Sequence, residues 1–220
     1  MKKIFVVFCS ILCLLSLVGC SKEVENRVSF RHNAYLTGSC ENLSLTVTSG
    51  VRESPYVADG EKGTMMEFCL ISLKPSASKD AVNTYSYEIE VDGEKLTGNF
   101  NKDVFGSTLS TDLGRDIGSK ITAVKVIMGE EEWVVPVENM MSNALVTSED
   151  ALKKAEEEFS EAIAEEEKEG KFREIYIKFV TDGIGGENAY YWYVAFVGEN
   201  RDYKAVLIDI VSGDIVAKRK

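Results

Sequence analysis

The sequence predicts an α+β protein in which an all-β sandwich precedes a helix packed on a three-stranded antiparallel sheet. Three patterns indicate this. Seven short apolar runs with turn residues between them lie within 28–137. A stripe of apolar residues at helical spacing follows within 148–169. Three more apolar runs with short connections then follow, and short connections favour antiparallel pairing.

The first part is expected to cover residues 28–141. Many short strands with Gly- and Asp-rich turns are typical of a sandwich or barrel, and their number suggests an immunoglobulin-like sandwich. The expected strands are 28–36, 43–49, 65–73, 84–91, 95–100, 120–128 and 133–137.

One hairpin can be predicted in register. Apolar and polar residues alternate up to Val91, and Asp92-Gly93 is a strong two-residue hairpin turn. Closing the chain there pairs Val91 with Glu94, Ile89 with Leu96, Tyr87 with Gly98 and Tyr85 with Phe100. A second hairpin is expected from 121–128 across a solvated turn at 129–132 to 133–135.

The second part is expected to cover residues 146–220. Thr147 and Asp150 have the spacing of a capping box, and Gly170 is a natural helix end. The acidic clusters of this helix are interpreted as a solvated face rather than a calcium site. The apolar stripe consists of Leu152, Ala155, Phe159, Ala162 and Ile163. Strands are expected at 173–180, 189–197 and 203–210. Residues 218–220 are expected to form an exposed tail.

The order of one helix and three strands resembles a PepSY domain. The local match is a terminal strand followed by a short turn. Gly213 is expected to adopt a backbone conformation in this turn that residues with a side chain disfavour. The residues that fill the places of the motif are Asp209, Ser212, Gly213, Asp214 and Ile215. The resemblance implies an extracytoplasmic, non-catalytic role in restraining a peptidase or binding a ligand.

The first 19 residues have the parts of a secretory signal: Lys2 and Lys3, an apolar run, and a small residue at position 19. The segment 17–20 resembles the lipobox of bacterial lipoproteins, which implies cleavage before Cys20 and lipid attachment to it. Residues 20–27 then form a tether on the extracytoplasmic face of a bacterial membrane, at the cell surface or in the periplasm. An ordinary signal peptide or a buried first helix is the alternative.

Charge excludes one class of partner. Without residues 1–19 the chain has 23 basic and 36 acidic residues, a formal net charge of −13. Nucleic-acid binding requires a basic footprint, so no nucleic acid is expected as a partner. An acidic surface is also not attracted to anionic lipid head groups, so we expect membrane contact through the N-terminal lipid alone.

Two cysteines remain after the signal and Cys20 are set aside. Cys40 and Cys69 form an even pair in an oxidising compartment, and a disulfide between them would close a loop of about 30 residues. Two free thiols, one of them buried in a strand, are the alternative.

No catalytic set stands out. His32 is the only histidine, and its polar neighbours indicate an exposed strand residue. The cysteines lack zinc-ligand spacing, so neither a metal nor a cofactor is expected. The Gly-rich segment 182–188 is interpreted as a hairpin loop rather than a phosphate-binding loop. A pair of catalytic carboxylates is not excluded by sequence.

Residues 190–193 are four consecutive aromatics. Strand alternation sends Tyr191 and Tyr193 to the sheet face opposite Tyr190 and Trp192. One helix covers only one face, so Tyr191 and Tyr193 form a candidate interaction surface for a partner or glycan. In the alternative, both faces of a central strand are covered, the second by the sandwich.

The sequence therefore predicts a non-enzymatic, lipid-anchored binding or regulatory protein with an envelope protein or glycan as its partner. Two other functions stay open. One is a carboxylate-based hydrolase of cell-wall material, and the other is a structural component of an envelope complex.

Overall fold

The computed structural model describes residues 24–41, 43–75, 84–102, 108–171, 173–181, 189–199 and 202–219. The predicted signal at 1–19, Cys20 and the Gly-rich segment 182–188 lie outside these residues, so those predictions stay untested. Within the described part, strands dominate and one long helix is present. No described helix is both long and apolar enough to cross a membrane.

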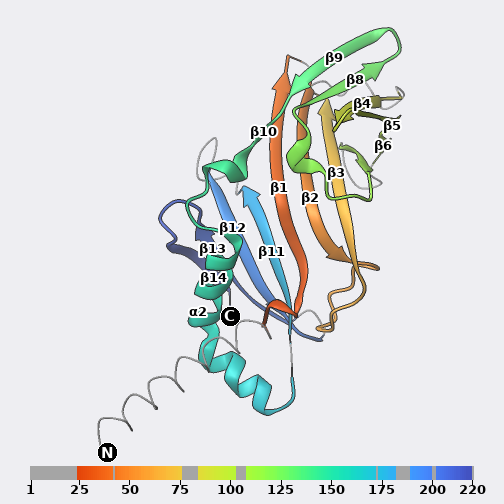
Figure 1. Cartoon of the computed structure of the whole chain (residues 1–220). Helices are drawn as coiled ribbons and strands as arrows, with labels where there is room; N and C mark the ends of the chain where they lie inside the picture. Colours follow the sequence, from red (N-terminus) through yellow and green to blue (C-terminus); the bar gives the residue numbers. More distant parts are fainter. Residues whose placement is uncertain are drawn as a thin grey trace, which may run out of the picture.

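The seven predicted strands of the first part are present, and three short ones accompany them (Figure 1). Their bounds are β1 Val28–Cys40, β2 Leu43–Glu53, β3 Met65–Pro75, β4 Ser86–Val91, β5 Glu94–Asn99, β6 Asn101–Lys102, β7 Leu109–Asp112, β8 Ala123–Met128, β9 Glu131–Pro136 and β10 Glu138–Asn139. Two 3-10 turns, η2 Gly118–Lys120 and η3 Met140–Asn143, connect them to their neighbours.

The second part contains the helix α2 Ser148–Lys168 and four strands. These are β11 Glu174–Thr181, β12 Tyr190–Val197, β13 Tyr203–Asp209 and β14 Ile215–Arg219. Lys218 and Arg219 are exposed, as predicted, but the prediction of a tail is wrong for these two residues, because they pair with Val206 and Ala205 as part of β14.

Both predicted hairpins form. Asp92-Gly93 turns the chain with positive φ at both residues, and the ladder pairs Val91 with Glu94, Ile89 with Leu96 and Tyr87 with Gly98. The second hairpin pairs β8 with β9 around Gly129. Its turn is shorter than predicted, since Glu131 and Glu132 belong to β9 rather than to the turn.

The predicted fold class is wrong in how the sheets are built. Instead of a separate three-stranded sheet, one ten-stranded mixed sheet runs in the order β14-β13-β12-β11-β1-β2-β3-β7-β6, with β10 beside β1. A parallel pairing of β1 with β11 joins the two halves of the chain, which the expected boundary between 141 and 146 had separated. The first half is therefore not an independent immunoglobulin-like sandwich.

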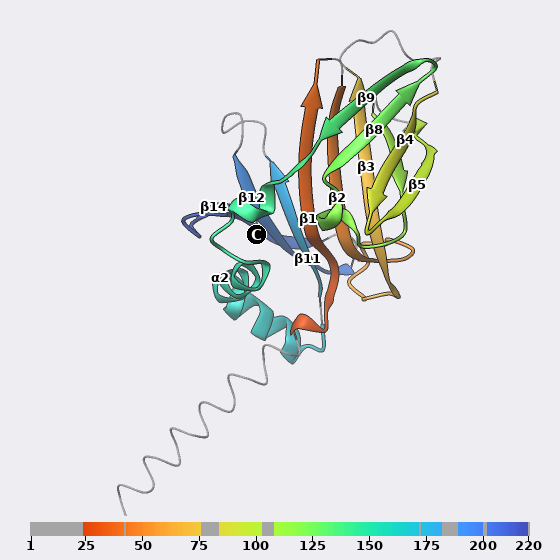
Figure 2. The ribbon, with the colours of Figure 1, turned by 45° about the horizontal axis from the view of Figure 1, so that its top comes forward.

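The second sheet has four strands in the order β5-β4-β8-β9. It packs over the β1–β3 part of the large sheet, so this part of the molecule is sandwich-like, while α2 lies over β12 and β13 (Figure 2). The core between the two sheets is mainly apolar. It includes Leu36, Leu45, Val47, Ile71, Leu73, Ile89, Val124, Val126 and Val135.

The capping-box prediction is confirmed. The Thr147 side chain accepts a hydrogen bond from the Asp150 N–H, and the Asp150 carboxylate accepts one from the Thr147 N–H. Leu152, Ala155 and Phe159 are buried on the sheet, and Phe159 meets the Phe196 ring edge-on. The helix ends before Gly170, which has a φ of 72°.

His32 is buried, so the prediction of an exposed strand residue is wrong. The ladder between β1 and β11 ends at Arg31 and Ile177, and β1 contains a bulge just after His32. There the His32 Nδ1 accepts a hydrogen bond from the Phe179 N–H at 3.0 Å. The imidazole thus takes the place of a ladder bond where the strands diverge. Burial, followed by the charge of Lys178, lowers the pKa of His32 to about 4.

This buried imidazole predicts a pH-dependent stability. The folded protein holds His32 neutral, whereas the unfolded chain takes up a proton below pH 6.5. Stability is therefore lost as pH falls from 6.5 toward 4. We expect His32 to contribute a loss of about 2 kcal/mol between pH 7 and pH 5.

Urea unfolding at both pH values measures this loss. In the variant His32→Asn, an amide oxygen takes the acceptor position without titrating. An equal drop in the free energy of unfolding of the variant and of the wild type would contradict the assignment.

Candidate functional site

One face of the large sheet is covered neither by α2 nor by the four-stranded sheet. The register places Phe30 beside Tyr176, and Lys178 beside Tyr193. Tyr193 in turn lies beside Leu207, so one face continues from β1 to β13. We call this surface the aromatic face, and its rings are Phe30, Phe68, Tyr176, Tyr193 and Tyr203.

The helix covers the opposite face. Trp192 is buried among the residues that pack against α2, and its Nε1–H donates to the Val146 carbonyl oxygen at 2.8 Å. Tyr190 packs on this side as well, stacked on Phe179. The aromatic run is thus divided between the two faces as alternation predicted, with Tyr193 on the aromatic face.

Residues 54–64 cross the aromatic face between β2 and β3, and we call them the strap. Two buried glutamates hold it. The Glu53 carboxylate accepts hydrogen bonds from the N–H groups of Val57 (3.1 Å) and Gly63 (2.8 Å). Glu174, on β11, accepts from the N–H groups of Asp59 and Gly60, each at 3.2 Å.

Glu174 also accepts a hydrogen bond from the Ser29 hydroxyl at 2.6 Å. Burial raises the pKa of its carboxyl, and the nearby charge of Glu53 acts in the same direction, while the hydrogen bonds oppose them. Glu53 and Glu174 are two buried carboxylates near enough for the charge of one to act on the other. Their oxygens bind backbone and hydroxyl donors, so the described contacts stabilise the strap.

The strap places Tyr56 on the aromatic face. Its ring lies 5.5 Å from that of Tyr176 and 5.9 Å from that of Phe30, centroid to centroid. The Lys178 ammonium lies over the rings of Phe30 (4.5 Å), Tyr176 (5.0 Å) and Tyr56 (5.4 Å). It also donates to the Tyr56 hydroxyl at 3.1 Å. Lys178 is therefore fixed by cation–π contacts.

Two adjoining hollows lie along this face, and both are lined by Tyr193 and Tyr203. The first, about 220 Å³, adds Tyr56, Tyr176 and Lys178 from the strap and β11. The second, about 240 Å³, reaches β14, and its lining includes Leu207, Ala217 and Arg219. We call the two together the tyrosine groove. Arg219 lies over the Tyr203 ring, 3.9 Å from its centroid, and donates to the Tyr203 hydroxyl.

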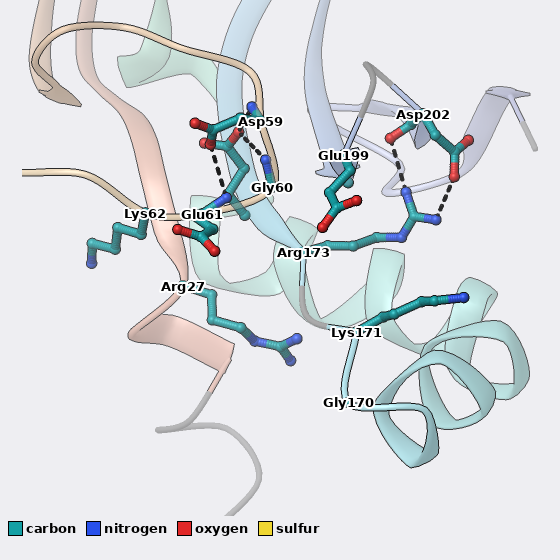
Figure 3. A pocket seen from close by; sticks show the side chains of 12 residues that line it. Arg27, Asp59, Gly60, Glu61, Lys62, Gly170, Lys171, Arg173, Glu199 and Asp202 are labelled. Carbon is teal, nitrogen blue, oxygen red and sulfur yellow. Dashed lines mark hydrogen bonds and ion pairs between the residues drawn. The ribbon is translucent and has the colours of Figure 1, made fainter.

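A further hollow, about 640 Å³, is lined by residues 59–62 of the strap together with Arg27, Arg173 and Asp202 (Figure 3). Arg173 makes four side-chain hydrogen bonds here. The guanidinium binds both oxygens of Glu166 at 2.6 and 2.8 Å, and the carboxylate of Asp202 at 2.6 Å. Arg173 and Lys204 hold the pKa of Glu166 at about 2. This network joins the end of α2 to β11 and β13, which gives the hollow a role in stability.

The cysteine pair is not bonded, and both thiols are free. Cys40 on β1 pairs with Leu43 of β2, and Cys69 on β3 pairs with Ser49 of β2. The two cysteines are therefore separated by the width of β2 and by six residues along it. This places their Cα atoms about 20 Å apart, too far for a disulfide. The predicted disulfide is therefore wrong. Burial raises the pKa of the Cys69 thiol to about 12, so it stays protonated.

The segment 209–215 forms a tight turn between β13 and β14. One oxygen of the Asp209 carboxylate accepts from the N–H groups of Val211 (2.9 Å) and Ser212 (2.7 Å). The Ser212 hydroxyl accepts from the Asp214 N–H, and Gly213 has a φ of 74°. Ile215 begins β14. The predicted turn is confirmed, and its residues orient the strand that carries Arg219.

Sequence reasoning missed most of the groove. The alternation of Ile175, Ile177 and Phe179 was a usable signal, because it sends Tyr176 and Lys178 to the other face. Tyr56 had no comparable signal, since an irregular segment carries it onto the sheet. Among the described residues, no group of three histidine, cysteine or acidic side chains is placed to hold a metal ion.

Comparison with family models, with curated proteins and with solved structures finds no match for this chain.

The contacts of Glu53 predict its effect on the strap. In Glu53→Ala the N–H groups of Val57 and Gly63 lose their acceptor. We expect a loss of about 2–4 kcal/mol in the free energy of unfolding, and faster hydrogen exchange at these two amides. Glu131→Ala, the same substitution at an exposed position on β9, is the matched control. Unchanged exchange at Val57 and Gly63 would show that Glu53 does not hold the strap.

Proposed function

We propose that the chain is a non-enzymatic binding or regulatory protein, lipid-anchored through Cys20 on the extracytoplasmic face of a bacterial membrane. Its partner is an envelope protein or glycan, and it binds through the aromatic face. The observation that carries the proposal is the tyrosine groove, an open aromatic surface beside a strap that two buried carboxylates keep in position.

Three features support this role. Tyrosine rings offer large, rigid contact area with a polar hydroxyl at the edge, which suits recognition surfaces. Exposed apolar residues, Tyr56, Val57 and Met66, flank the same face. The resemblance of the motif at 209–215 to PepSY domains agrees with a role in restraining a peptidase or binding a ligand.

Photo-crosslinking tests the binding surface. A benzophenone amino acid in place of Tyr193 reports partners at the aromatic face. The same residue in place of Val134, an exposed position on β9, serves as the matched control. We expect a discrete adduct in cells from position 193 and not from position 134. Adducts from position 134 alone, together with cell-wall hydrolysis by the purified chain, would reject the proposal.

The anchor is tested by Cys20→Ala. This variant lacks the thiol that the proposed lipid would modify, so we expect release from the membrane fraction with unchanged thermal unfolding. Fractionation followed by immunoblotting measures the release. A variant that stayed in the membrane fraction would contradict lipid anchoring at Cys20.

A further inference from the structure

Two cations flank the tyrosine groove, and contacts with aromatic rings hold each of them in position. Lys178 stands at the β11 end over Phe30, Tyr56 and Tyr176, and Arg219 stands at the β14 end over Tyr203. Among the described residues neither cation makes an ion pair, although the chain carries 36 acidic residues. Both charges are therefore oriented and not neutralised by a described carboxylate.

The sheet register sets the spacing of the two cations. Lys178 lies beside Tyr193, which lies beside Leu207 and then Ala217, and Arg219 is two residues further along β14. Three strand spacings and two residues put the Cα atoms of Lys178 and Arg219 about 16 Å apart. An extended segment of about five residues spans this distance.

The floor between the two cations is apolar. Ala58, Val197, Ala205, Leu207 and Ala217 line the two hollows between the tyrosine rings. The polar side chains of the lining are the tyrosine hydroxyls, Lys178, Arg219 and Lys218, and Lys218 is paired with Glu158 at 2.7 Å. Few groups there are therefore able to pair with a sugar's hydroxyls. A hydroxyl buried without a partner costs about 1–3 kcal/mol, so this floor favours apolar side chains over a glycan.

We propose that the tyrosine groove binds an extended acidic peptide segment of a protein partner. Apolar side chains of the segment lie on the tyrosine rings, and carboxylates at its two ends pair with Lys178 and Arg219. The inference rests on the proposed function and adds the chemical class of the ligand. Because the chain is strongly acidic overall, recognition depends on these two local charges rather than on long-range attraction.

Calorimetric titration of the full mature chain in detergent tests the ligand class. The probe is a capped peptide with glutamate at both ends and three leucines between them. It is compared with a peptide in which glutamine replaces both glutamates. We expect at least tenfold tighter binding of the acidic peptide. Oligogalacturonate, an acidic glycan of similar length, is expected to bind more weakly than the acidic peptide.

Variants of the two cations locate the contact. Lys178→Gln and Arg219→Gln should each weaken binding of the acidic peptide about five- to tenfold. Neither should change the affinity for the glutamine peptide. Lys95→Gln, on β5 in the other sheet, makes the same change in charge and should have no effect. Thermal unfolding of each variant checks folding, and the comparison of peptides on the wild type requires no variant.

Equal affinity for the two peptides, or tighter binding of oligogalacturonate, would overturn the inference. So would a loss of affinity in Lys95→Gln equal to that in Lys178→Gln. If crosslinks form at position 193 while the peptides are not distinguished, the binding role stands and the acidic peptide is rejected. If neither occurs, the proposed function fails as well.

Discussion

The parallel pairing of β1 with β11 is the contact on which the other arrangements depend. Residues 28–31 and 175–177 come from opposite ends of the chain, and their ladder turns two sets of antiparallel strands into one sheet. His32 completes the junction by accepting the Phe179 N–H where the ladder stops. A neutral imidazole inside the sheet satisfies a backbone donor that the diverging strands would otherwise leave unpaired.

Joining the halves creates the surface that we assign to binding. Phe30 and Phe68 come from the first half, and Tyr176, Tyr193 and Tyr203 from the second, yet they pack as one cluster. Neither half alone would present this row of rings. The strap reinforces the connection, since Glu53 of β2 and Glu174 of β11 bind different parts of the same eleven-residue segment.

Charged groups have two different roles around the strap. On one side, Glu166 of α2 binds Arg173 through both carboxylate oxygens and also pairs with Lys204. These contacts join α2 to the sheet, and partial burial strengthens each ion pair. On the other side, Lys178 and Arg219 contact rings rather than carboxylates. The first set of charges stabilises the fold, and the second is open to a ligand.

The sequence by itself determined the local structure. Alternation and the Asp92-Gly93 turn set the register of the first hairpin, Thr147 and Asp150 set the start of α2, and 209–215 set a turn. These features depend on neighbours within a few residues, which a sequence displays directly. The division of residues 190–193 between two faces followed from alternation for the same reason.

Only the tertiary structure decided how the elements join. No local pattern shows that β1 lies beside β11 across more than 140 residues, because parallel pairing leaves no turn between the strands. For that reason the predictions of a separate second sheet and an exposed His32 were wrong. The predicted Cys40–Cys69 disulfide was wrong for a different reason, since the register of β1, β2 and β3 places the two cysteines far apart. The tyrosine groove follows the same rule, since its tyrosines come from the strap, β11, β12 and β13, and only long-range packing brings them together.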